Sequence, residues 1–330
     1  MLKPIRTYLG LHPQQRPVLL LIDVEPDARK VSPGEGGWEG SKTFLGHIRP
    51  LRRRLEELTR TQVEFNWFLR LDPQIRETWG KATSVADACP DLLNYIQDHG
   101  DFCGVHPHLW RWHPRRKEWF NELNDPGWTA ECLQTSIESF RTLFQRPPQA
   151  CRFGDRWLNQ QAVDLMQVSG IRYDLTVEPG LPAEPFFDDP HATGRLPDYR
   201  SLPREPYQPA SGNFMMPADG DAEADSLWII PLTTTPPVWR LMRHPPYVVK
   251  ASRSLNLAFR SAYVRHHLTT ELDAVTDAPL TIVVRTGDMA TSRFLDNFIR
   301  TTEELLAQTA LLRCQFTNPV EAVSRWQAAR

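Results

Sequence analysis

The chain of 330 residues is long enough to bury a large core, and its 41% hydrophobic and 24% charged residues are ordinary values for a globular protein. The formal net charge of -2 provides no domain-wide basic field, which argues against a nucleic-acid-binding protein. The five cysteines are widely spaced without a CxxC pair, and we find neither a secretory signal nor an apolar run of membrane-spanning length, so we expect a reduced, cytoplasmic protein without a membrane span.

The first predicted element is a buried strand over residues 18–24 that ends in carboxylates. Its apolar run is followed by Asp23, Glu25 and Asp27, and alternation along a strand places these three acids on one face. Pro26 cannot continue a central ladder, so the strand should stop there. Like charges this close cost free energy unless a cation, an arginine or a proton relieves them. The simpler interpretation is a strand end with solvated acids.

The rest of the chain alternates between predicted strands and helices. Further strands are expected at 63–69, 102–110, 151–153, 171–175, 228–232, 280–284 and 314–316, and helices at 48–59, 90–99, 129–145, 157–169, 293–311 and from 319 onward. Residues 178–226 are rich in Pro, Asp and Gly without a period, which is typical of a functional or mobile loop. Seven or eight strand–helix units favour a single α/β domain over residues 1–330, a (β/α) barrel with this Pro-rich insertion.

Polar side chains follow several predicted strands, where barrels carry their active sites. His106 and His108 stand at i and i+2 on the third strand. A carboxylate with two imidazoles is a ligand set for zinc or another first-row divalent ion. A second carboxylate can then act as a base toward water, held ionised by an arginine. Alone, the two histidines would be ordinary polar residues at a strand end.

Other polar and aromatic groups are candidates for the same pocket. Trp110, Asp72, Trp157 and Asp174 are assigned to substrate binding, although Asp72 before a proline is equally a turn start and Asp174 equally a cap. Aromatic residues are dense between 110 and 128. Aromatic faces stack on sugar rings, so they indicate either a glycan platform or a small satellite core or subunit contact.

In this order the motifs resemble those of the polysaccharide deacetylases, the carbohydrate esterases related to the rhizobial nodulation-factor deacetylase. The matching stretches are Asp-Val-Glu-Pro-Asp at 23–27, Gly-x-His with a second His at 104–108, Cys-Arg-x-Gly-x-Arg-Trp at 151–157 and Tyr-Asp-Leu-Thr-x-Glu-Pro-Gly at 173–180. The likeness spans roughly residues 17–326, and its first three motifs are the specific ones. It implies a distorted (β/α) barrel and metal-dependent hydrolysis of N-acetyl groups on a carbohydrate or amino-sugar substrate.

The resemblance also implies roles for individual residues. Asp23 would be the catalytic base, Glu25 and His106 metal ligands, and Arg152 the partner of the base. The metal would be zinc, with cobalt or nickel as alternatives. The competing interpretation of Arg152 is a structural one, in which it donates hydrogen bonds to backbone carbonyls or pairs with surface acids.

Three departures from the family pattern stand out. Glu25 replaces the usual aspartate, and the position of the usual second histidine is Trp110, which leaves His108 first and His113 second as candidates. The late motif normally supplies a histidine acid, whereas this chain has Arg285, which cannot release a proton near neutral pH but can stabilise an oxyanion.

The general acid would then come from elsewhere in the chain. His191 and His244 have the required side chain, but the residues around them do not indicate a site. Two competing interpretations follow from the departures. One is a non-catalytic glycan-binding relative of the deacetylases, and the other is a metal-dependent hydrolase of another C–N amide bond.

Overall fold

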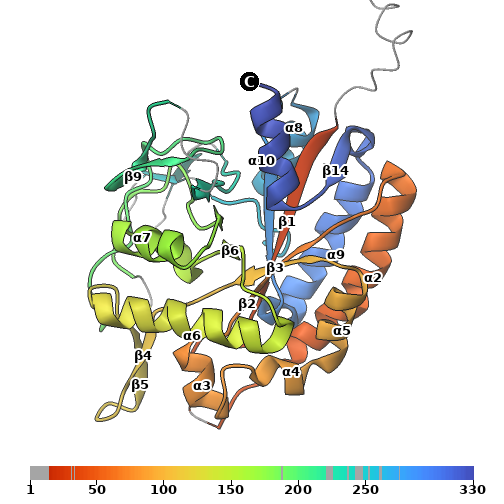
Figure 1. Ribbon diagram of the computed structural model, residues 1–330. Helices are drawn as coiled ribbons and strands as arrows, with labels where there is room; N and C mark the ends of the chain where they lie inside the picture. Colours follow the sequence, from red (N-terminus) through yellow and green to blue (C-terminus); the bar gives the residue numbers. More distant parts are fainter. Residues whose placement is uncertain are drawn as a thin grey trace, which may run out of the picture.

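A parallel sheet of eight strands runs through the centre of the molecule in the computed structural model (Figure 1). The structure describes residues 15–30, 32, 34–186, 189–220, 226–235, 238–241, 248–251, 253–259, 262–274 and 276–330. The sheet order is β10-β7-β6-β3-β2-β1-β13, and β14 pairs with the beginning of β1. The strands are β1 (Arg16–Val24), β2 (Asn66–Leu69), β3 (Phe102–Val105), β6 (Ala150–Cys151), β7 (Tyr173–Asp174), β10 (Trp228–Ile229), β13 (Leu280–Arg285) and β14 (Cys314–Phe316).

Helices flank the sheet, with α2, α5 and α9 on the right of Figure 1 and α6 and α7 on the left. The helices are α2 (Glu39–Thr59), α3 (Pro73–Trp79), α4 (Ser84–Ala88), α5 (Pro90–Asp98), α6 (Pro126–Phe144), α7 (Gln160–Val168), α8 (Ala262–Asp273), α9 (Ser292–Leu306) and α10 (Pro319–Ala328), with short 3-10 turns η1 (Gly154–Arg156), η2 (Gly287–Ala290) and η3 (Thr309–Arg313). Among the described residues, none of the helices combines the length and the apolar composition needed to cross a bilayer.

In the described part of the chain, three two-stranded antiparallel ribbons lie outside the central sheet. They are β4 (Trp110–His113) with β5 (Glu118–Asn121), β8 (Pro209–Ala210) with β9 (Asn213–Pro217), and β11 (Val238–Leu241) with β12 (Val248–Ala251). The β4–β5 hairpin projects away from the body of the protein (Figure 1).

β1 positions the acids because its two faces pack into different clusters. Its even-numbered apolar residues lie in the large cluster beneath the helices, whereas Leu19 and Leu21 lie in a smaller cluster on the opposite, inner face. The alternation continues, so Asp23 and Glu25 emerge on the inner side. A slip of one residue would move Asp23 into the large apolar cluster, where burying its charge without a partner is costly.

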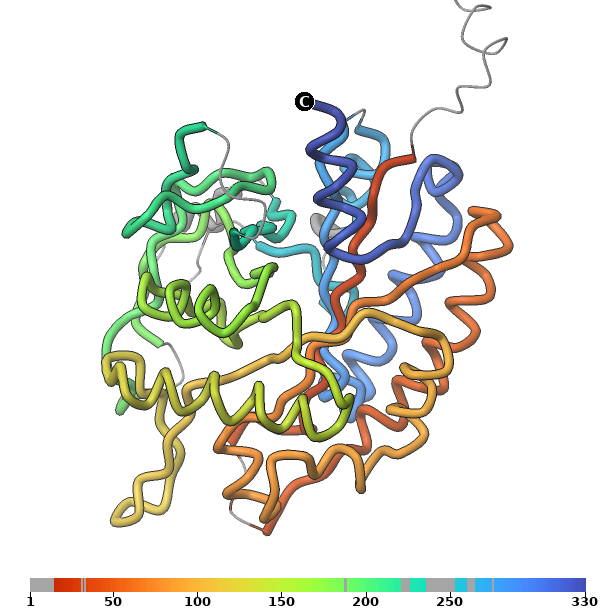
Figure 2. The backbone as a smooth tube through the Cα atoms, viewed as in Figure 1, coloured from red at the N-terminus to blue at the C-terminus, as the bar shows by residue number. Residues whose placement is uncertain are grey.

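α10 closes the inner cluster at the N-terminal ends of the strands, where it contributes Ala322 and Val323. Figure 2 shows this last helix beside the beginning of β1, and residues of the two elements are in contact. The sequence Asn318-Pro319 sets the start of the helix, because the Asn318 side chain accepts a hydrogen bond from the Glu321 N–H (3.0 Å) and proline occupies the first turn. One end of the sheet is thereby sealed, and polar residues gather at the other.

The edge strands β10 and β13 are joined through two irregular segments, 231–235 and 253–257. Thr234 bridges to Ser254, and Val283 of β13 donates to Leu255 O and accepts from Leu257 N (2.8 and 3.0 Å). The parallel sheet thus curls into an incomplete barrel closed by loop segments. This arrangement confirms the predicted distorted (β/α) barrel.

Several elements differ from the sequence-based expectation. β3 ends at Val105 rather than at 110, because Pro107 has no N–H to give to a ladder. α2 begins at Glu39, nine residues before the predicted start, and the Asp27 carboxylate accepts hydrogen bonds from Glu39 N and Gly40 N (3.0 and 2.8 Å). Asp27 therefore caps a helix and does not join the other two acids. Neither α3 nor the β4–β5 hairpin was expected, and the 178–226 insertion contains the β8–β9 ribbon.

Candidate active site

A pocket of about 300 Å³ opens at the C-terminal ends of the strands. Six residues predicted as catalytic or metal-binding line it: Asp23, Glu25, His106, His108, Arg152 and Arg285. They come from β1, the segment after β3, the segment after β6 and the end of β13. This is the end at which (β/α) barrels carry their active sites.

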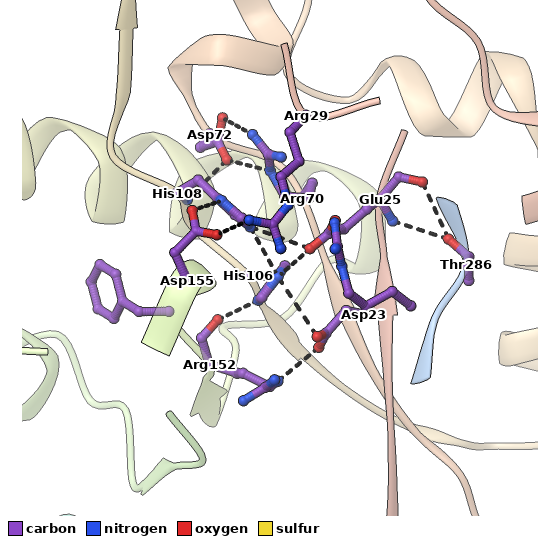
Figure 3. Close-up of polar contacts among 12 residues, drawn as sticks. Asp23, Glu25, Arg29, Arg70, Asp72, His106, His108, Arg152, Asp155 and Thr286 are labelled. Carbon is purple, nitrogen blue, oxygen red and sulfur yellow. Dashed lines mark hydrogen bonds and ion pairs between the residues drawn. The ribbon is translucent and has the colours of Figure 1, made fainter. Parts of the chain in front are cut away.

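Glu25, His106 and His108 form a compact buried triad (Figure 3). Glu25 Oε1 lies 2.8 Å from His106 Nε2 and 3.3 Å from His108 Nε2, and the two Nε2 atoms are 3.1 Å apart. Ligands held about 2.0–2.1 Å from a tetrahedral zinc ion lie roughly 3.3 Å from one another. The three atoms therefore have the spacing of one face of such a site.

The outer nitrogens of both imidazoles are held by acceptors. His106 Nδ1 lies 2.5 Å from the backbone carbonyl of Arg152, and His108 Nδ1 lies 2.9 Å from Asp155 Oδ2. A carbonyl only accepts, so His106 carries a proton on Nδ1, and its Nε2 atom faces the triad. Burial alone would raise the pKa of Asp155, but the charges of Arg29 and His108 outweigh it and hold that pKa far below its usual range. Asp155 is thus an anion that orients His108 in the same way.

Two imidazole Nε2 atoms and a carboxylate oxygen therefore converge within 3.3 Å. Neutral imidazoles would repel the carboxylate at these distances, so a proton or a metal cation belongs among the three atoms. Nitrogen and oxygen donors of this kind, with their outer nitrogens hydrogen-bonded, are typical of zinc and other first-row divalent ions. The residues present fit a divalent metal ion.

The second oxygen of Glu25 is held by Arg285. Oε2 accepts from Arg285 Nε (3.0 Å) and also from Arg285 Nη2. Burial alone would raise the pKa of Glu25, but Arg285 and the two histidines hold that pKa well below its ordinary value. Glu25 is therefore anionic, with Oε1 directed at the imidazoles. The oxyanion role expected for Arg285 stays a prediction, because this guanidinium is engaged with a ligand of the triad.

Asp23 and Arg152 form a buried ion pair beside the triad. Arg152 donates through Nε to Asp23 Oδ1 (2.8 Å) and through Nη1 to Leu175 O (2.8 Å), while Asp23 Oδ2 lies 3.9 Å from His106 Nε2. One oxygen of Asp23 is thus fixed by arginine, and the other faces the triad (Figure 3). The end of β1 is in turn tied to β13, because Thr286 N donates to Asp23 O (2.9 Å) and Glu25 N donates to Thr286 Oγ1 (3.0 Å).

The turn after β6 explains the pattern Arg-x-Gly-Asp-Arg. A Cβ added at Gly154 would lie only 2.1 Å from His108 Nε2, so only glycine leaves room for the imidazole. Asp155 and Arg156 then adopt left-handed backbone angles (φ of 54° and 53°), which cost of order 1–3 kcal/mol each in non-glycine residues. No role was predicted for Gly154 or Asp155; their position between the two arginines of this motif was the available signal.

None of the four residues predicted to contact substrate lines the pocket, and we do not carry that prediction forward. Trp110 is fully buried in the large cluster, edge-on to Phe186 at a ring-centroid distance of 5.5 Å. Trp157 is 3% exposed and packs against Phe153. Neither indole has a free face for a sugar ring. Trp110 thus fits the packing interpretation of the aromatic-rich stretch, as do the buried Trp119 and Trp128, and Trp157 is likewise a core residue.

Asp72 and Asp174 are buried supports. Asp72 pairs with Arg70 (2.7 Å), accepts from Ile75 N at the start of α3 and accepts from His108 N (3.0 Å). It therefore fixes the backbone of a triad residue. Asp174 accepts from Thr176 Oγ1 (2.7 Å), and burial raises the pKa of Asp174 to about 6.

The two alternative histidines that the structure describes do not reach the triad. His113 lies on the β4–β5 hairpin near Phe120, and His191 lies 3.4 Å from Glu118 with its side chain 41% exposed. His244 lies outside the described residues. Glu178, which follows β7 in the motif at 173–180, also lines the pocket, although no role was predicted for it.

No protein-family model and no curated protein sequence matches this chain. Solved structures match it in fold. A protein described as a glycoside hydrolase/deacetylase from Parabacteroides distasonis gives a TM-score of 0.60 at 12% identity, covering 97% of this chain and 73% of that chain. The Puue allantoinase gives a TM-score of 0.55 at 13% identity, covering 97% of this chain and 96% of that chain. A protein described as a polysaccharide deacetylase from Mycobacterium smegmatis gives a TM-score of 0.52 at 14% identity, covering 97% of this chain and 92% of that chain. This chain has the fold of the polysaccharide deacetylases, as the order of its motifs predicts.

Proposed function

We propose that this protein is a divalent-metal-dependent hydrolase that removes N-acetyl groups from an amino sugar or glycan precursor. The observation that carries the proposal is the buried Glu25-His106-His108 triad with the Asp23–Arg152 pair at its side. Two of the structures with the same fold are described as acting in deacetylation, which supports the choice of amide hydrolysis.

Each residue of the site has a defined task in this reaction. Zinc, cobalt or nickel suits the donor set of Glu25, His106 and His108, and such an ion supplies a Lewis acid for the acetyl carbonyl when bound. Asp23 accepts a proton from the attacking water through the oxygen that Arg152 leaves free. Arg152 keeps Asp23 ionised and oriented, and Arg285 does the same for Glu25.

Metal analysis of the purified protein tests the first part. We expect about one divalent ion per chain, lost in His106→Ala and retained in His113→Ala, the matched histidine on the projecting hairpin. A wild-type protein that binds none of zinc, cobalt or nickel would instead support the non-catalytic glycan-binding alternative.

The base is tested separately with Asp23→Asn, which keeps the shape of the side chain but cannot accept the proton. We expect amide hydrolysis to fall by about 10²–10⁴-fold, the usual contribution of a general base, while the bound metal stays. Full activity of Asp23→Asn would remove Asp23 from the mechanism.

A second candidate is hydrolysis of another C–N amide bond. It is favoured by the similarity in fold to an allantoinase over almost the whole of both chains, and by Arg285 at the position where the deacetylase pattern has a histidine. A panel of N-acetylated amino sugars, allantoin and simple acetamides, assayed with the metal-loaded protein, distinguishes the two. Turnover of allantoin or simple amides alone would move the assignment to the second candidate.

A further inference from the structure

We propose that Glu178 is the proton donor to the departing nitrogen, the task that the deacetylase pattern gives to a histidine. This inference rests on the proposed amide hydrolysis and adds a catalytic residue to it. Glu178 lines the same pocket as Asp23 and Glu25 but comes from a different wall, since it follows β7 whereas the two acids end β1. A base and an acid on separate walls can serve the two sides of one scissile bond.

The backbone around Glu178 is fixed by the segments that close the barrel. Leu232 N donates to Val177 O (2.9 Å), and Thr234 Oγ1 donates to Pro179 O (2.6 Å). Both neighbours of Glu178 are therefore anchored. Its own carboxyl group is hydrogen-bonded to Ser254 of the second closing segment.

The charges that act most strongly on Glu178 belong to residues of three different elements. Arg152 follows β6, Arg156 belongs to η1, and Asp23 lies on β1. Burial is the largest influence and raises the pKa of Glu178; the Asp23 charge acts in the same direction, and the two arginines and Ser254 oppose it without cancelling it. A carboxyl group that keeps its proton more readily than usual is suited to donate it to a leaving group.

The other titratable residues described in the pocket lining are less suited to donate a proton to the leaving group. The outer nitrogens of both histidines donate to Arg152 O and Asp155, and Asp155 is itself held by Arg29. Glu184 pairs with Arg156 and is half exposed. Arginine does not release its proton near neutral pH. Among these residues, Glu178 is the group left to donate.

The step balances without another reactant. The oxygen of water forms a bond to the acetyl carbon while its proton passes to Asp23. The C–N bond then breaks with its electron pair on nitrogen, and the Glu178 proton joins that nitrogen to give the free amine. Asp23 returns its proton to solvent, and Glu178 takes one from solvent.

Glu178→Gln tests this role through the leaving group. An alkyl amine must be protonated to depart, whereas 4-nitrophenolate leaves as a stable anion. With the metal-loaded protein we expect Glu178→Gln to lose about 10²–10³-fold on an N-acetyl amide, within the usual range for a general acid, and less than threefold on 4-nitrophenyl acetate. Glu178→Asp, which retains a shorter carboxyl group, should recover part of the amide activity.

Glu64→Gln is the matched control. Burial also raises the pKa of Glu64, whose carboxylate accepts from Asn318 Nδ2 (2.8 Å) at the opposite end of the strands. Glu64→Gln should hydrolyse both substrates as the wild type does. Melting temperature and metal content, measured on every variant, identify any loss of the fold or of the site.

A second readout does not depend on activity. In the infrared difference spectrum between wild type and Glu178→Gln, the protonated carboxyl band of Glu178 should titrate above the ordinary glutamate pKa of about 4.3. A titration at or below that value overturns the acid role.

The kinetic outcomes separate the two proposals. Equal losses on amide and ester, or unchanged amide hydrolysis in Glu178→Gln, overturn the acid role and leave the hydrolase assignment intact. A wild-type protein that hydrolyses neither substrate with zinc, cobalt or nickel overturns both.

Discussion

Replacing Gly154 by alanine tests the triad by the smallest change available. The added Cβ would lie 2.1, 2.2 and 2.3 Å from three atoms of the His108 ring. The angle φ of Gly154 is not in the left-handed region, so alanine adds no backbone strain there. The perturbation therefore falls on the imidazole and not on the turn.

The size of the effect follows from these distances. Ordinary van der Waals contact begins at 3.4 Å, so the His108 ring must move by about 1.3 Å, the difference between 3.4 and 2.1 Å. Metal–ligand distances tolerate about 0.2 Å, so such a shift removes His108 from the coordination sphere. We expect zinc affinity to fall by about 100-fold or more, since misplacement of groups around a metal alone costs 10–100-fold.

The assay is competition for zinc against a chromophoric chelator, with His108→Ala measured in parallel. Gly46→Ala is the control, because Gly46 lies in α2 with nothing within 4 Å of an added Cβ, and alanine there improves helix propensity by about 1 kcal/mol. It should leave zinc affinity unchanged. If Gly154→Ala bound zinc as tightly as the wild type, His108 would not be a ligand and the triad would have to be abandoned.

The neighbouring charges give three further predictions. Asp155→Asn should weaken zinc binding by about 10–100-fold in the same competition assay, because His108 loses the anion that orients it. The pKa values of Asp155 and Glu25 lie below their ordinary values in the folded protein, so both carboxylates stabilise the fold above about pH 4–5. This stabilisation is lost as the pH falls further. The melting temperature should therefore fall less steeply between pH 7 and 3 for Asp155→Asn than for the wild type. Glu25→Asp and Arg285→Met should be non-additive in zinc affinity, with a coupling above about 0.5 kcal/mol in a double-mutant cycle, and additivity would show that their ion pair does not shape the site.

The residues after β1 and β3 could be found from the sequence because their positions depend on local rules. Alternation along β1 fixes the side on which Asp23 and Glu25 emerge, and parallel strands bring their C-terminal ends to one edge of the sheet. Pro107 then ends β3, so that His106 and His108 lie on irregular backbone. These rules need only the order of apolar and polar residues.

The remaining features depend on contacts that no local pattern contains. Trp110 is a residue type that often stacks on sugar rings, but its ring is covered by packing against Phe186, which lies 76 positions away in the sequence. Asp27 has the spacing of a third acid of the site, but its carboxylate accepts a hydrogen bond from Glu39 N at the start of α2. Glu178 reaches the pocket only because segments 231–235 and 253–257 close the barrel around it. A single sequence does not specify which loops meet.

Two departures from the deacetylase pattern, Glu25 and Arg285, belong together physically. In the register of β1 and β13, Arg285 stands opposite Asp23, on the strand next to the one that carries Glu25. The carboxylate of Glu25 spans the gap, with Oε1 on the imidazoles and Oε2 on Arg285. An aspartate, shorter by one C–C bond of about 1.5 Å, would have to give up one of these contacts. In the proposed reaction, arginine occupies the position of the usual acid and is paired with Glu25. The proposed proton donor, Glu178, therefore lies on another wall of the pocket, where burial favours its proton.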